Sequence, residues 1–215
     1  TIAEMLFLLA AGMPLFDSIV SAFSTAGTGG YSIKNASIAA YNSASIEYII
    51  AIFMMIFGIN FNLFYLLIIK DFADIFKNEE LKYYLGIIAG ATLLITVNIM
   101  GMYEHIEEAF RDAFFQVTSL ITTTGFITAN YELWPEFSKT MLAVIIMIGA
   151  CGGSTGGGLK VSRLIILLKM ITQELKRMVH PRSVNIIKLD GMKIEQETVD
   201  SVTSFFVIYI FLIFG

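Results

Sequence analysis

The sequence STAGTGGY at residues 24–31 recurs in related form 95 residues later, as SLITTTGF at residues 119–126. Each copy follows a short apolar segment and precedes a long one. The residues that match at this offset include Ser24 with Ser119, Thr28 with Thr123, Asp17 with Asp112 and Asn35 with Asn130. A short helix, a Thr/Gly-rich loop and a membrane-spanning helix, repeated in this order, are typical of pore loops.

Such a loop can replace the water around a cation with backbone carbonyl oxygens. A dehydrated cation in a bilayer needs closely spaced oxygens, and a Thr/Gly stretch can aim its carbonyls at one axis. Gly30 and Gly125 can adopt conformations that other residues avoid, which an extended loop with inward carbonyls requires. The predicted filter residues are Thr28, Gly29, Gly30 and Tyr31 in the first loop and Thr122, Thr123, Thr124, Gly125 and Phe126 in the second.

The composition indicates that most of this chain lies in lipid. Of its 215 residues 56% are hydrophobic and 15% are charged, and the mean hydropathy is +0.75. Three stretches, 45–69, 83–103 and 139–168, are long enough to cross a hydrocarbon core, which takes about 20 helical residues. The net charge of −4 says little about partners, because the charges are segregated along the chain. The sequence has no basic patch that would indicate nucleic-acid binding.

A glycine-rich run interrupts the third of these stretches. Residues 149–158 read GACGGSTGGG, and six glycines in ten residues should break a helix. The apolar end segments 2–12 and 202–215 are each too short to span a bilayer alone. The chain also lacks a signal-peptide pattern, so we expect an internal fragment cut within a membrane helix at both ends.

Lysines and arginines predict the orientation in the membrane. They concentrate in the connections 70–82 and 169–193, which should therefore be cytoplasmic. The opposite side carries carboxylates that would raise the local cation concentration at a pore entrance: Glu104, Glu107, Glu108, Asp112, Glu132 and Glu136. Both Thr/Gly loops should open toward this negative rim.

Two segments, 14–23 and 107–121, are too short to span the membrane yet too apolar for surface loops. We expect re-entrant half-helices, because non-helical backbone at membrane depth is tolerated only inside protein or along a wet cavity. The partly negative C-terminal end of each half-helix would favour a cation. Asp17 and Asp112 would lie near the helix N-termini, where a carboxylate is also favoured.

The order and spacing of four motifs resemble the TrkH/KtrB/HKT potassium-transporter superfamily, most closely its TrkH branch. The motifs span almost the whole chain: AFSTAGTGGYS at 22–32, TTTGF at 122–126, LWP at 133–135 and GGSTGGGLKV at 152–161. The resemblance implies an all-α membrane protein built from repeats of helix, pore helix, filter loop and helix around one pore.

The same resemblance divides the chain into parts of three repeats. It implies a second repeat with a truncated first helix at 1–69, a third repeat with a broken second helix at 83–168 and the start of a fourth at 201–215, joined by cytoplasmic linkers at 70–82 and 169–200. Gly30 and Gly125 would then be two of four filter glycines. The implied potassium ligands are the backbone carbonyls of Thr28, Gly29, Gly30, Thr123, Thr124 and Gly125.

In this superfamily an intramembrane loop beneath the filter gates conduction. The resemblance places this loop in the glycine run, and glycines lower the cost of rearranging backbone. The implied gate residues are Gly149, Gly152, Gly153, Ser154, Thr155, Gly156, Gly157, Gly158 and Lys160. Lys160 would either repel ions in the closed state or snorkel to the inner interface.

The glycine run has two other readings. A stripe of small residues can be a close helix-packing surface. A phosphate-binding P-loop needs Lys and then Ser or Thr directly after its last glycine. Here Gly158 is followed by Leu159, Lys160 and Val161, with no hydroxyl and no flanking strand, and we reject this reading.

Other chemistry is sparse. His105 and His180 should lie on opposite faces of the membrane and cannot share a metal, and Cys151 has no partner for an internal disulfide. Glu4 either faces the pore or is a buried acid with a partner. The sequence has no constellation of nucleophile, base and orienting group, so we predict no enzymatic activity and no covalent cofactor.

The predicted function is potassium uptake across the bacterial plasma (inner) membrane, through a carbonyl-lined filter with a glycine-rich gate. The alternatives are a non-conducting scaffold or sensor and a transporter that does not distinguish Na⁺ from K⁺; channel and H⁺- or Na⁺-coupled symport both remain open. The resemblance further implies a homodimer and a cytosolic nucleotide-binding regulatory subunit of the TrkA or KtrA type. The linker 169–200 would either dock this subunit or touch anionic lipid headgroups.

Overall fold

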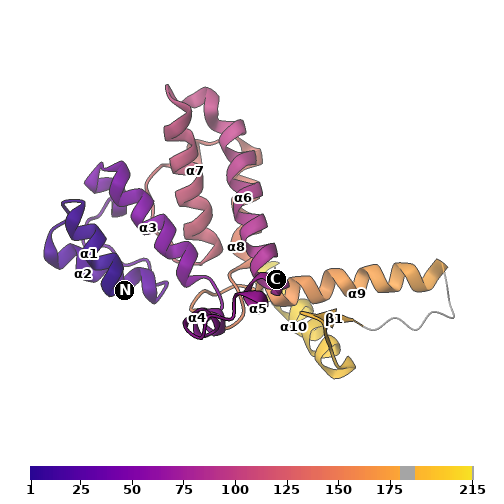
Figure 1. The fold of residues 1–215 in the computed structure, drawn as a ribbon. Coiled ribbons are helices and arrows are strands. Elements are labelled where there is room, and N and C mark those ends of the chain that lie inside the picture. The colour runs from indigo at the N-terminus through magenta and orange to yellow at the C-terminus, as the bar shows by residue number, and fades with distance from the viewer. Residues whose placement is uncertain (180–186, 215) are drawn as a thin grey trace.

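The computed structural model describes residues 1–179 and 187–214, and regular structure in these ranges is almost entirely helical (Figure 1). The helices are α1 (Ile2–Ala10), α2 (Leu15–Ala26), α3 (Ala44–Phe57), α4 (Phe61–Ile68), α5 (Phe72–Lys77), α6 (Glu79–Ile99), α7 (Ile106–Ile121), α8 (Glu136–Ile148), α9 (Val161–Val179) and α10 (Gln196–Phe214). Three 3₁₀ helices, η1 (Ser37–Tyr41), η2 (Met100–Met102) and η3 (Tyr131–Leu133), and a hairpin of β1 (Lys188–Leu189) and β2 (Met192–Lys193) complete the described elements. The predicted all-helical fold is confirmed.

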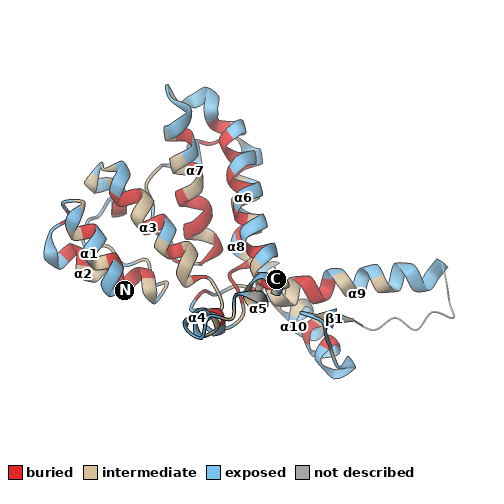
Figure 2. Ribbon diagram, viewed as in Figure 1, coloured by how far each residue is buried: buried red, intermediate tan, exposed pale blue. Residues whose placement is uncertain are grey.

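The two expected half-helices are α2 and α7, and they end at equivalent positions. Ala26 and Ile121, the last residues of α2 and α7, lie 95 residues apart, as the loop motifs do. Helix α7 lies between α3 on one side and α6 and α8 on the other (Figure 1). Side chains of its middle and C-terminal turns are largely buried (Figure 2). A polar-rich half-helix is thus enclosed by protein, as membrane depth requires.

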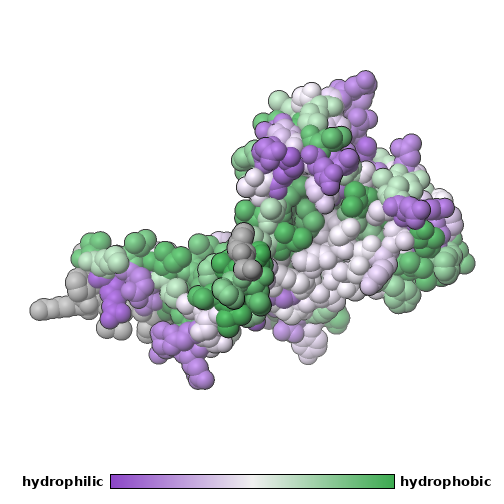
Figure 3. Space-filling view, turned by 180° about the vertical axis from the view of Figure 1, so that it is seen from behind, coloured by the Kyte–Doolittle hydropathy of each residue, from purple (hydrophilic) through white to green (hydrophobic). Residues whose placement is uncertain are grey.

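Apolar side chains on the outer surface indicate contact with lipid. Leu93, Leu94 and Val97 on α6 are 59%, 52% and 64% exposed. Hydrophilic side chains gather at the tip where α6 and α7 meet, and hydrophobic ones cover much of the flanks below (Figure 3). Among the described helices, Glu79–Met102 and Gln196–Ile213 are long and apolar enough to cross a membrane.

The expected span at 45–69 is broken, because it consists of two helices, α3 and α4, that are bent by 91° relative to each other. The bend at Gly58 frees backbone groups that the glycine run then uses. Cys151 N donates to Gly58 O at 3.0 Å, and Phe61 N donates to Gly153 O at 3.1 Å. The side chain of Asn60 caps α4 by accepting from Asn62 N at 3.0 Å.

The glycine run breaks the stretch at 139–168 as predicted, since α8 ends at Ile148 and α9 begins at Val161. Helix α9 continues to Val179, beyond the expected end at residue 168. The expectation that the C-terminal apolar segment is too short to span is wrong, because α10 begins at Gln196 and has 19 residues. Its polar first turns add the length that the apolar pattern alone did not show.

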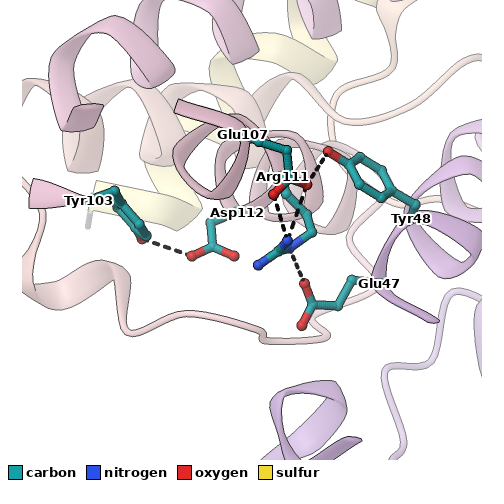
Figure 4. Close-up of polar contacts among 6 residues, drawn as sticks. All are labelled: Glu47, Tyr48, Tyr103, Glu107, Arg111 and Asp112. Carbon is teal, nitrogen blue, oxygen red and sulfur yellow. Dashed lines mark hydrogen bonds and ion pairs between the residues drawn. The ribbon is translucent and has the colours of Figure 1, made fainter. Parts of the chain in front are cut away.

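A polar network on the predicted outer side joins α3 to α7 (Figure 4). Arg111 Nε lies 2.7 Å from Glu47 Oε2, and Arg111 Nη1 lies 3.0 Å from Glu107 Oε2. The hydroxyl of Tyr48 donates to Glu107 Oε1 at 3.0 Å. Part of the predicted negative rim is therefore neutralised within the protein.

The matched aspartates are bonded in the same way. Asp17 Oδ2 accepts from the hydroxyl of Tyr41 at 2.6 Å, and Asp112 Oδ2 accepts from that of Tyr103 at 2.8 Å. Each bond ties the first turns of a half-helix to a neighbouring segment. The pairing explains why aspartate occurs at this position in both repeats.

We predict that Arg111→Met destabilises the protein by about 3 kcal/mol, because it leaves the Glu47 carboxylate buried without its cation. The Glu47 side chain is only 10% exposed. Arg177→Met is the matched control, since its pair with Glu174 is exposed and should contribute less than about 1 kcal/mol. Thermal unfolding in detergent would show a lower Tm for Arg111→Met alone; equal shifts would contradict the prediction.

Candidate ion-conduction site

The two Thr/Gly loops have the same unusual backbone. Positive φ occurs at Thr28 (49°) and Gly30 (66°) and recurs at the equivalent Thr123 (56°) and Gly125 (87°). Gly29 and Thr124, which lie between the two residues of each loop, do not have a positive φ. Alternation of left- and right-handed residues turns successive carbonyls toward the same side of an extended chain, which is the arrangement that an ion-coordinating loop needs.

Six carbonyl groups of these loops accept no hydrogen bond from the residues that the structure describes. Among the described residues, no donor bonds to the carbonyl oxygens of Thr28, Gly29, Gly30, Thr123, Thr124 and Gly125. Of the residues that carry them, Thr124 is buried, Thr28, Gly30 and Thr123 are partly buried, and Gly29 and Gly125 are exposed. These oxygens are therefore open to water or to an ion.

The ends of the predicted filter differ from its middle. Thr122 O accepts from Thr123 Oγ1 at 2.7 Å, and Phe126 O accepts from Ser119 Oγ at 2.7 Å. These two carbonyls are therefore occupied. In the first loop the matched serine has a related bond, with Tyr31 N donating to Ser24 Oγ at 2.6 Å. A serine of each half-helix thus holds the residue seven positions later.

The two loops lie against each other. A Cβ atom on Gly30 would collide with the carbonyl of Thr124, and the positive φ of Gly30 disfavours any side chain. Further out, Ala39 N donates to Ile127 O and Ile127 N donates to Ser37 Oγ, both at 3.2 Å. The two Thr/Gly loops and the segments that follow them are thus in contact.

The glycine run folds into a closed loop. Leu159 N donates to Met147 O at 3.1 Å and Lys160 N donates to Ile148 O at 2.9 Å, which ties the two ends together. Gly149 has a φ of 76°, and a Cβ there would collide with the carbonyl of Gly157. This crossing of two backbones explains the need for glycine.

This glycine loop contacts both filter loops. Gly157 N donates to Thr123 Oγ1 at 2.7 Å, and Thr28 Oγ1 lies 3.1 Å from Thr155 O. Thr28 and Thr123 are equivalent residues, so the loop bonds to the same position in each repeat. The side chain of Lys160 donates to Gly156 O within the loop. Of the predicted gate residues, Gly156, Gly157 and Thr155 lie nearest the filter.

Sequence reasoning missed one residue of this region. Glu80 is 5% exposed, and its carboxylate accepts from Gly152 N at 2.6 Å. The sequence places it in the predicted cytoplasmic linker 70–82, and its position beside a predicted span is the one signal there that it is buried. Glu4 is fully buried in α1, and Cys151 is buried in the glycine loop. His180 lies outside the described residues.

Within the described ranges, no group of three or more His, Cys, Asp or Glu side chains can hold a metal ion. The arrangement presents neutral backbone oxygens, which suit a weakly hydrated monovalent cation.

Comparisons with known proteins agree with one another. The family model TrkH, described as a cation transport protein, matches residues 8–103 and 88–215. The Trk system potassium uptake protein TrkH of Salmonella typhimurium is 39% identical over 97% of the chain, and that of Halomonas elongata is 34% identical over all of it. The crystal structure of the potassium transporter TrkH from Vibrio parahaemolyticus superposes with a TM-score of 0.90 at 36% identity over 96% of the chain.

The chain spans less than half the length of these relatives. It covers 44% of the Salmonella protein, 45% of the Halomonas protein and 45% of the Vibrio chain.

We predict that Gly30→Ala abolishes ion binding at this site, because the added methyl group displaces the Thr124 carbonyl. The measurement is the rise in Tm of the whole protein in detergent when K⁺ replaces choline, since a bound ion stabilises the folded state. Gly86→Ala on α6 is the control, because its Cβ would meet nothing within 4 Å. A K⁺-dependent rise retained in Gly30→Ala would refute the assignment.

Proposed function

This chain belongs to the TrkH family of cation transport proteins, and we propose that it forms part of a pathway for potassium uptake across the bacterial inner membrane. The relatives are named as potassium uptake proteins, in agreement with the prediction of a transporter rather than an enzyme. Because the chain covers less than half of each relative, the pathway needs further loops to enclose an ion.

The observation that carries this proposal is the row of six unbonded carbonyls on two adjacent loops. Thr28, Gly29 and Gly30 provide three of them, and Thr123, Thr124 and Gly125 provide the equivalent three. Potassium would exchange its hydration shell for these oxygens site by site, with no covalent chemistry. Ser24 and Ser119 form hydrogen bonds at the outer ends of the loops, and Thr28 and Thr123 form them at the inner ends. These bonds would hold the carbonyls in position.

The glycine loop is the proposed gate. Its bonds to Thr28 and Thr123 keep it at the inner ends of both filter loops, where it would obstruct an ion leaving the filter. The loop spans two helix ends without helical hydrogen bonds of its own, so its displacement would not require either helix to unfold. The alternative interpretation of this run is close packing of small residues. It explains why Gly149 lies against the backbone of Gly157, but not why the loop is bonded to both Thr28 and Thr123.

Regulation and assembly are further parts of the proposal. Helix α9 continues to Val179 and exposes apolar side chains near its end, with Leu175 58% and Met178 79% exposed. Lys176 and Arg177 lie beside them. This mixed surface would suit a cytosolic nucleotide-binding subunit of the TrkA or KtrA type better than lipid headgroups alone. We further propose a homodimer, in line with the family resemblance.

Potassium-dependent growth of an uptake-deficient bacterium, or flux into liposomes, tests the filter when the full-length parent is used. We expect Gly125→Ser to change the K⁺/Na⁺ preference, because a side chain at a φ of 87° forces the loop to rearrange. Gly101→Ser, which lies outside the loops and has open space, should leave selectivity unchanged. A parent that carries no ion would favour a non-conducting scaffold, and unchanged selectivity in Gly125→Ser would contradict the filter.

The same assay tests the gate. Deletion of residues 152–158 should raise basal potassium flux, because it removes the obstruction below the filter along with its bonds to Thr28 and Thr123. The protein level in the membrane, measured in parallel, serves as the control for expression. Flux that stays at the parent's level would refute the gate.

A further inference from the structure

A buried carboxylate holds the glycine loop at both of its ends. Glu80 Oε1 accepts from Gly152 N at 2.6 Å and from Ser162 N at 3.0 Å. Gly152 lies where the chain enters the loop, and Ser162 lies in the first turn of α9, where the chain leaves it. One oxygen atom therefore bridges two backbone positions that are ten residues apart.

The bridge is electrostatically favourable although it is buried. Hydrogen bonds from N–H groups to a carboxylate are stronger than those to a neutral oxygen. The N-terminus of α9 adds its partial positive charge at Ser162. A buried carboxylate that lost these donors would be strongly disfavoured, so the side chain and the two backbone segments have to stay together.

The residue sits on a turn that is anchored independently of the loop. Asn78 caps α6 by accepting from Leu81 N at 2.8 Å. Glu79 forms an ion pair with Lys169 on α9, and its N–H donates to Asp190 Oδ1 at 2.6 Å. The Glu80 carboxylate is thus presented by a fixed helix end, whereas the partner it holds is a glycine-rich segment.

We propose that Glu80 is the positioning residue that keeps the glycine loop seated against Thr28 and Thr123. Opening of the loop breaks the bonds from Gly152 and Ser162 to the carboxylate, so the strength of this bridge sets the balance between the closed and open positions. The inference rests on the proposed gate. In this proposal the closed state is stabilised by the side chain of Glu80, which lies outside the glycine loop.

Basal flux of the full-length protein in liposomes tests this proposal. Glu80→Ala should raise it about tenfold or more, since a hydrogen bond to a charged group contributes roughly a factor of ten or more to an equilibrium constant. Glu80→Gln keeps the shape and one acceptor oxygen without the charge, and should give a smaller increase. Glu195→Gln is the control, because this exposed carboxylate lies just before α10 and does not touch the loop or the turn that carries Glu80, and its flux should equal that of the parent.

A second readout follows the loop directly. Cys151 precedes Gly152 and is fully buried, so a thiol reagent should modify it slowly in the parent. Release of Gly152 should expose it, and mass spectrometry of the peptide that contains Cys151 measures the rate. We expect faster modification in Glu80→Ala and, to a lesser degree, in Glu80→Gln. If Glu80→Ala does not fold, Glu80→Gln alone decides: a rate equal to that of Glu195→Gln overturns the proposal.

The deletion of residues 152–158 separates the two proposals. If the deletion raises flux and the Glu80 variants do not, the gate stands and the role of Glu80 is overturned. If neither the deletion nor the Glu80 variants raise flux, the gate itself fails and the positioning role fails with it. Raised flux in the deletion and in Glu80→Ala, together with faster modification of Cys151, supports both.

Discussion

The structure depends on one constraint: backbone carbonyls that make no hydrogen bond inside a membrane protein need water or an ion. Six carbonyls of the two Thr/Gly loops accept no hydrogen bond from the described residues, and in the proposed filter they would face an ion. Positive φ at Thr28 and Thr123 turns the chain, and Ser24 and Ser119 fix the outer ends of the loops. An extended, unpaired backbone at this depth is stable only where a polar cavity replaces the missing bonds.

The glycine loop and the bent helix pair form a second layer around this filter. The 91° bend between α3 and α4 and the break between α8 and α9 lie in contact, because each supplies the partners that the other lacks. Glu80 joins this layer to the start of α6. The two Thr/Gly loops, the glycine loop and the N-terminal end of α6 are thus linked by hydrogen bonds, through which a change in one element would affect the next.

Periodicity and motif spacing predicted the half-helices and the break in the glycine run, because each has a local signature, while the role of the Thr/Gly loops as a filter stays a prediction. The bend at Gly58 escaped prediction, since a single glycine in an apolar stretch does not reveal that Cys151 will donate to its carbonyl. Glu80 was missed for the same reason: its partners are backbone N–H groups far along the chain. The pairing of Arg111 with Glu47 likewise depends on how α7 packs against α3.

Anomalous scattering from crystals of the full-length protein grown in rubidium or thallium salts tests most directly where the ion binds. The predicted result is one or more anomalous peaks on the axis faced by the carbonyls of Thr28, Gly29, Thr123 and Thr124, which disappear when the crystals are transferred to a choline salt. Peaks confined to the carboxylates of the outer rim, with none between the two loops, would contradict it.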